Sequence, residues 1–104
     1  MQLELQKSIV EKTRAALPEL RRLVLFGSQA RGQATADSDI DLIAVVARVP
    51  ASGPRTLAWR KSLISLQKPF DLVVLTPDEW AAGQRLVGSA VAAAAAEGVV
   101  LYAS

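Results

Sequence analysis

Apolar positions along the chain follow two periods, one typical of amphipathic helices and the other of buried strands. Helical spacing and helix-start signals predict four helices: residues 2–17, residues 55–68, a short helix from residue 76, and residues 89–97. Apolar runs predict strands over residues 20–26, 39–49 and 70–75, with a short final strand or an extended tail over residues 99–102. Beyond Asp41 the second run is apolar on both faces, as in a central strand that is covered on both sides.

Proline and glycine set the expected ends of these helices. Pro18 ends the first helix, and the Lys-Pro pair at residues 68–69 stops the second. Residues 76–79, Thr-Pro-Asp-Glu, match a capping box with proline at the first helical position. Gly83 and Gly88 are expected to divide the segment that follows into two helices.

The second predicted helix has two apolar faces. Trp59, Leu63 and Leu66 lie at helical spacing on one face, and Leu57 and Ile64 lie nearly opposite. We expect Trp59 to pack in the core. The second apolar face suggests contact with a partner, although ordinary core packing would also account for it.

A Gly-Ser pair, Gly27 and Ser28, follows the first strand. Residues 28–31 are expected to form one helical turn that Gly32 caps. Gly27 lets the backbone approach a ligand closely, and N–H groups at a helix start favour phosphate oxygens. The pattern therefore indicates a phosphate-binding turn, to which the Ser28 hydroxyl adds one hydrogen bond.

Three aspartates lie at the starts of the next two strands. Asp39 and Asp41 project from the same side of an extended chain, where two carboxylates repel each other unless a cation or a proton lies between them. Mg²⁺ suits such a pair because it prefers one or two carboxylates plus substrate phosphates. If the strand of Asp71 lies beside them, that carboxylate deprotonates an attacking hydroxyl or shares a second metal.

Each of these features alone is common in turns and loops, and their combination is what indicates a functional site. Two other motifs fail at specific positions. Residues 27–32 match the first part of a P-loop, but residues 33–34 are Gln-Ala where Lys and Ser or Thr are required. Residues 37–41 resemble the start of an EF-hand loop, but Leu42 replaces the required glycine and Arg48 the closing glutamate.

Composition limits the remaining possibilities. The length of 104 residues fits one domain, and with neither cysteine nor histidine the chain lacks thiolate metal sites, the usual zinc sites and Ser-His or Cys-His nucleophiles. The formal net charge of +2 is too small to argue for nucleic-acid binding. The sequence contains neither a signal-peptide pattern nor an apolar run of membrane-spanning length, so the expected location is the cytoplasm.

The segment GSQARGQATADSDIDL closely resembles the signature of the minimal nucleotidyltransferases of the DNA polymerase β-like superfamily. That signature combines Gly-Ser, a spacer of about this length, Asp-hydrophobic-Asp, and a third carboxylate on a later strand. The matching positions are Gly27, Ser28, Asp39, Asp41 and Asp71, with Ala30-Arg31-Gly32, Ser38 and the closing EGVVLY of residues 97–102 as further family-like features.

This resemblance implies an α/β (α+β) fold with a mixed sheet and helices packed mainly on one face, formed by residues 1–104 as a single domain. It implies transfer of a nucleoside monophosphate from ATP or another NTP to an acceptor hydroxyl, with Mg²⁺ as the metal. The implied roles are nucleotide binding by Gly27, Ser28, Arg31 and Ser38, metal binding by Asp39, Asp41 and Asp71, and activation of the acceptor by Asp71.

The resemblance also suggests a partner. Small proteins of this family are often the antitoxin of a helical HEPN-domain toxin, whose tyrosine they modify with AMP. A chain of this size has no room for the substrate-binding domain of larger relatives, so the acceptor is expected from another chain or from a second copy. Two alternatives remain open: a non-catalytic binding module that covers a helical partner, and a small-molecule nucleotidyltransferase that acts as a dimer.

Overall fold

A four-stranded mixed sheet forms the centre of the protein in the computed structural model, which describes residues 1–35 and 38–104. The strand order is β3-β2-β1-β4, where β1 is Leu20–Phe26, β2 is Ile40–Val46, β3 is Phe70–Leu75 and β4 is Val99–Ala103. β1 pairs antiparallel with both β2 and β4, whereas β2 and β3 are parallel. The predicted mixed sheet is confirmed, and the predicted final segment is a strand.

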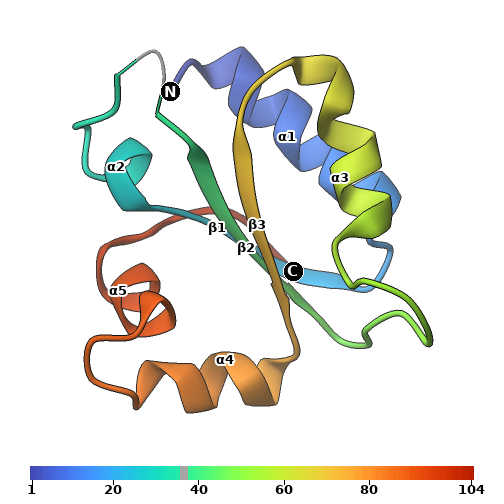
Figure 1. The fold of residues 1–104 in the computed structure, drawn as a ribbon, viewed down its shortest axis with the longest axis vertical. Helices are drawn as coiled ribbons and strands as arrows, with labels where there is room; N and C mark the ends of the chain where they lie inside the picture. Colours follow the sequence, from blue (N-terminus) through green and yellow to red (C-terminus); the bar gives the residue numbers. More distant parts are fainter. Residues whose placement is uncertain (36–37) are drawn as a thin grey trace.

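Helices lie on both sides of this sheet (Figure 1), and not mainly on one face as the resemblance implied. Their bounds are α1 Leu3–Ala16, α2 Gly27–Ala30, α3 Leu57–Leu63, α4 Pro77–Gln84 and α5 Ala90–Glu97. α1 and α3 pack on one face of the sheet and on each other, and α4 and α5 pack on the opposite face. None of the helices within the described ranges is long and apolar enough to cross a membrane.

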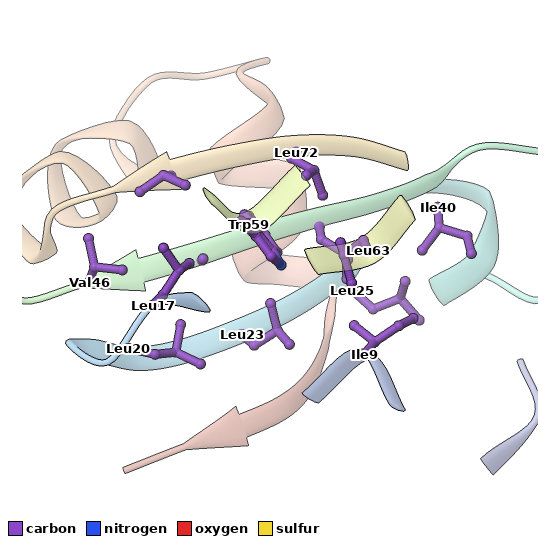
Figure 2. Close-up of a cluster of buried hydrophobic side chains, with 13 residues drawn as sticks. Ile9, Leu17, Leu20, Leu23, Leu25, Ile40, Val46, Trp59, Leu63 and Leu72 are labelled. Atoms are coloured by element: carbon purple, nitrogen blue, oxygen red, sulfur yellow. The ribbon is translucent and has the colours of Figure 1, made fainter. Parts of the chain in front are cut away.

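The larger core lies between the sheet and the α1–α3 pair (Figure 2). Trp59 of α3 is fully buried there, as predicted, and its Nε1 donates a 2.7 Å hydrogen bond to Oγ1 of the buried Thr13 on α1. This bond satisfies two polar groups that would otherwise be buried unpaired. Residues that alternate along β2, such as Leu42 and Ala44, complete this core from the sheet.

A smaller core lies on the other face, where Ile43 and Val45 of β2 contact Val24 of β1 and Ala94 of α5. β2 is therefore covered on both faces, as its apolar run predicted. Asp41 points to this second face, because it alternates with the residues of the larger core.

Some predicted boundaries differ from the structure. The helix predicted over residues 55–68 is shorter, since α3 ends at Leu63 and a 3-10 helix over Ile64–Leu66 follows it. Two other differences have identifiable reasons. β2 ends at Val46 and not at residue 49, because Val46 pairs with Leu20, the first residue of β1, and a single 2.9 Å hydrogen bond from the Ala47 N–H to the Glu19 carbonyl follows this pair. Gly83 lies inside α4, so the prediction that it divides the helices is wrong. A Cβ at Gly83 would overlap Val91 of α5, which shows that this glycine allows close helix packing.

Candidate active site

The candidate site lies at the edge of the sheet where β1 ends and β2 and β3 begin. Asp41, the second residue of β2, pairs with Phe26 at the end of β1 and with Asp71 at the start of β3. Residues in register on neighbouring parallel strands point to the same face. The side chains of Asp41 and Asp71 therefore project together, on the face that carries the smaller core.

Gly27 brings the backbone directly against one of these carboxylates. Its φ is +70°, and a Cβ built on it would overlap Asp41 Oδ2. Gly27 is thus required twice, for its backbone conformation and for the space that the carboxylate occupies. The predicted helical turn follows as α2, and Gly32, with φ of +71°, lies beyond its end.

The charges of the site act on one another. Burial raises the pKa of Asp41, and the negative charges of Asp71 and then Asp39 raise it further, whereas the positive charge of Arg31 lowers it. Asp41 is partly buried, while Asp39 and Asp71 are exposed. The three predicted acids are therefore close enough to repel one another, and a bound cation would relieve that repulsion.

The donor set fits a hard divalent cation. Carboxylate oxygens are the ligands that Mg²⁺ prefers, and it needs only one or two of them beside water and phosphate oxygens. Within residues 1–35 and 38–104, no three Asp, Glu, His or Cys side chains are arranged to hold a metal ion by themselves. Asp39 and Asp41 would hold such an ion together with a nucleotide, so their metal-binding role remains a prediction.

The residues predicted to bind the nucleotide lie between the end of β1 and the start of β2. Ser28 lies in α2, where its carbonyl accepts a 3.0 Å hydrogen bond from the Gln33 N–H. The Ser38 hydroxyl accepts a 2.9 Å hydrogen bond from the Thr35 N–H, which gives it a local role in the loop before β2. Asp37, part of the EF-hand resemblance, lies outside the described residues.

Arg31 has a partner that the sequence did not indicate. Its Nη1 lies 3.8 Å from Oε2 of Glu97, the last residue of α5, and its Nε donates a 3.2 Å hydrogen bond to Gln33 Oε1. Glu97 opens the closing EGVVLY motif, which was family-like in sequence but carried no assigned role. Arg31 and Glu97 are far apart in the sequence, so their contact could be recognised only in the folded structure.

A nucleotidyltransferase domain model matches residues 7–94, and the chain belongs to this family. The resemblance found in the sequence is thereby confirmed. No curated protein sequence matches the chain.

Solved structures share its fold. A toxin–antitoxin complex with AMP-PNP matches with a TM-score of 0.72 at 24% identity, over 95% of this chain and 73% of that chain. The complex of a tri-AMPylated Shewanella oneidensis HEPN toxin with an MNT antitoxin matches with a TM-score of 0.66 at 23% identity, over 100% of this chain and 74% of that chain. A Sulfolobus solfataricus protein assigned as a nucleotidyltransferase matches with a TM-score of 0.63 at 26% identity, over 94% and 77%.

Proposed function

We propose that this chain is a Mg²⁺-dependent nucleotidyltransferase that transfers AMP from ATP to a hydroxyl of a partner protein. The observation that carries this proposal is the register of β2 and β3, which brings Asp71 beside Asp41 next to the Gly27 turn. In this proposal residues 1–104 act as one minimal nucleotidyltransferase domain in the cytoplasm.

Each group has a role in the transfer. Backbone N–H groups after Gly27, the Ser28 hydroxyl and Arg31 bind the phosphates, and Asp39 and Asp41 hold the metal, with Ser38 as a further nucleotide contact. Bound Mg²⁺ would neutralise phosphate charge. The acceptor oxygen forms a bond to the α-phosphorus, the bond from that phosphorus to the bridging oxygen breaks, and pyrophosphate leaves. Asp71 takes the proton of the acceptor hydroxyl and lies exposed, where an acceptor can reach it.

The proposed partner is a helical HEPN-domain toxin, for which this chain would be the antitoxin. Support comes from structural neighbours that are toxin–antitoxin complexes, one with AMP-PNP and one with a tri-AMPylated HEPN toxin. Within the chain, Leu57 at the start of α3 and Ile64 in the 3-10 helix that follows it (Ile64–Leu66) support a partner, because 47% and 68% of their surfaces are exposed. Large apolar side chains exposed together are typical of protein contacts.

The same exposed pair favours a second candidate, a binding module that neutralises the partner by covering it. A small-molecule nucleotidyltransferase that acts as a dimer is a third possibility. These candidates differ in what the carboxylates must do, because only the enzymes require them to be ionised and bound to metal.

Transfer of radiolabelled AMP from ATP separates these candidates. The acceptor is a small helical protein that co-purifies with the chain or is encoded beside it. We expect wild type to label it in Mg²⁺, Asp39→Asn with Asp41→Asn to leave it unlabelled, and EDTA to abolish labelling. Asp78→Asn, which removes an exposed acid of α4, is the matched control and should label normally. Equal neutralisation of the partner by wild type and the double variant, with no label transferred, would establish the binding module instead.

A further inference from the structure

The ion pair between Arg31 and Glu97 joins two elements that border the site. Arg31 follows α2, and Glu97 ends α5 on the face of the sheet to which Asp41 points. The distance of 3.8 Å from Nη1 to Oε2 is too long for a hydrogen bond, and both side chains are about half exposed, at 46% and 59%. The contact is therefore electrostatic and loose.

The end of α5 is fixed in place although this contact is loose. Gly98 follows Glu97 directly, and a Cβ there would overlap the Ala94 carbonyl oxygen and Cγ1 of Val24 on β1. The next residue, Val99, pairs with Leu25 of β1. Glu97 is consequently held beside the strand that leads into the Gly27 turn.

Helix stability does not account for a glutamate at this position. The C-terminal end of a helix carries partial negative charge, so an acidic residue in its last turn is unfavourable. At this position Glu97 lies near Arg31, whose charge also acts on Asp41. Arg31 is thus shared between Glu97 on one side and the catalytic carboxylates on the other.

We propose that Glu97 is a positioning residue that acts through Arg31 and competes with the phosphates of the nucleotide for its guanidinium. In the nucleotide-free chain Glu97 retains Arg31 at the border of the site, and the arriving triphosphate displaces it. This inference rests on the proposed function, since it requires a triphosphate at the Gly27 turn.

The strengths of the two contacts determine the direction of the effect. Guanidinium–phosphate contacts are often bidentate and charge-assisted, whereas an exposed pair at 3.8 Å is weak. Phosphate therefore wins the competition, and removal of Glu97 should strengthen nucleotide binding by about two- to fivefold, the range expected for loss of one exposed ion pair. A residue that mainly oriented Arg31 for phosphate would give the opposite sign.

Calorimetric titration of the full chain with Mg²⁺ and AMP-PNP tests this proposal. We expect Glu97→Gln to bind about two- to fivefold tighter than wild type and Arg31→Gln to bind more weakly. In the Arg31→Gln background, Glu97→Gln should change the affinity much less, because its effect requires the guanidinium. With a protein acceptor, Glu97→Gln should lower KM for ATP and leave kcat unchanged.

The matched control is Glu79→Gln, which removes the other Arg–Glu ion pair, at the opposite end of the sheet, and should leave nucleotide affinity unchanged. Unchanged or weaker binding by a folded Glu97→Gln variant would overturn the proposal. The proposal would also be overturned if Glu97→Gln raised the nucleotide affinity equally in the Arg31→Gln background. Such a result would mean that the lost negative charge acts on the nucleotide directly and not through Arg31. Failure of wild type to bind AMP-PNP would instead reject the proposed function and this inference with it.

Discussion

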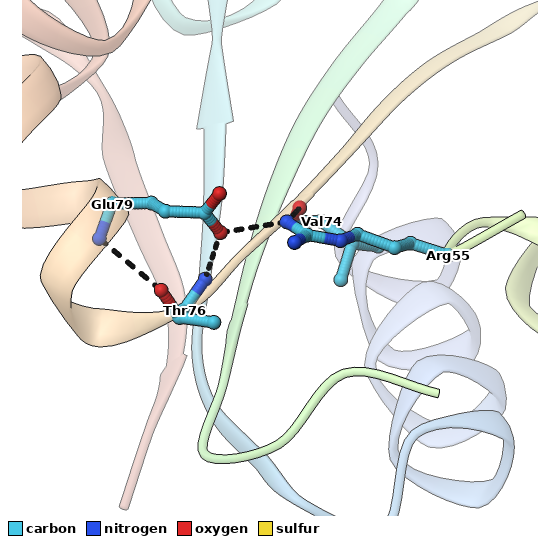
Figure 3. A network of polar contacts seen from close by, with 4 residues as sticks. All are labelled: Arg55, Val74, Thr76 and Glu79. Carbon is cyan, nitrogen blue, oxygen red and sulfur yellow. Dashed lines mark hydrogen bonds and ion pairs between the residues drawn. The ribbon is translucent and has the colours of Figure 1, made fainter. Parts of the chain in front are cut away.

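Two carboxylates near opposite ends of β3 have their pKa values shifted in opposite directions. Near the end of the strand, the pKa of Glu79 is lowered by a hydrogen bond from the Thr76 N–H and then by one from Arg55 (Figure 3). Beside the start of the strand, burial and two further aspartates raise the pKa of Asp41. Each shift follows from what surrounds the carboxylate.

The difference separates a structural acid from one suited to bind a ligand. Glu79 completes a capping box with Thr76 and accepts a 2.6 Å hydrogen bond from Arg55 Nη1, which also donates to the Val74 carbonyl at 3.3 Å. The protein itself therefore supplies this carboxylate with a positive charge and a hydrogen-bond donor. Asp41 has like charges nearby, and within residues 1–35 and 38–104 only the shared Arg31 opposes them, so its compensation is expected from a bound cation.

The largest expected contrast in AMP transfer is between variants that replace one acid at each end of β3. Asp71→Asn should reduce AMP transfer on the order of 10²–10⁴-fold, the usual contribution of a general base. Glu79→Gln should leave transfer unchanged while lowering stability slightly, because it removes the ion pair with Arg55 although the glutamine can still accept the Thr76 N–H of the capping box. The measurements are initial rates of AMP transfer and thermal unfolding. Comparable transfer by both variants would remove Asp71 from the chemistry.

Gly27 and Gly32, whose φ angles are nearly the same, give a smaller expected contrast in AMP transfer. Gly27→Ala should reduce AMP transfer on the order of 10²-fold, because its Cβ displaces the Asp41 carboxylate. Gly32→Ala has an equally unfavourable φ but meets nothing within 4 Å, so it should lose stability and retain activity. Transfer rates and unfolding temperatures measured on both variants separate displacement from backbone strain. Equal activity loss in the two variants would contradict the role given to Gly27.

The smallest expected effect is on the pH dependence of stability, measured by urea unfolding in EDTA from about pH 3 to pH 7. The raised pKa of Asp41 stabilises the fold below the ordinary aspartate pKa, and this contribution is lost as pH rises. The lowered pKa of Glu79 stabilises the fold above the ordinary glutamate pKa, and this contribution is lost as pH falls. Relative to wild type, Asp41→Asn should therefore gain stability with rising pH and Glu79→Gln should lose it. Parallel curves would show that the two environments do not differ.

Much of the fold was predictable because local signals agree with the packing. The strands predicted over residues 20–26 and 70–75 have the bounds of β1 and β3, and the capping box before α4 is present. Predictions failed where a neighbour decides the outcome. The length of β2 depends on where β1 begins, and Gly83 serves the packing of Val91.

The candidate site divides in the same way. The relation of Asp39 to Asp41 follows from strand alternation, and the Gly-Ser pair comes beside them because β1 and β2, neighbours in sequence, pair antiparallel with Phe26 opposite Asp41. Asp71 and Glu97 come from distant segments, and their positions depend on the β2–β3 register and on the packing of Gly98 against β1. A sequence pattern names such residues, but only the assembled sheet determines which of them meet.

The parallel pairing of β3 with β2 has a consequence for folding. β1 and β2 pair across a short connection, whereas β3 joins them only after a crossover that includes α3. Closure of a longer loop costs more chain entropy, and non-local strand pairing is slow. We therefore expect Asp71 to reach the other acids late in folding, after the turn at Gly27 has already formed.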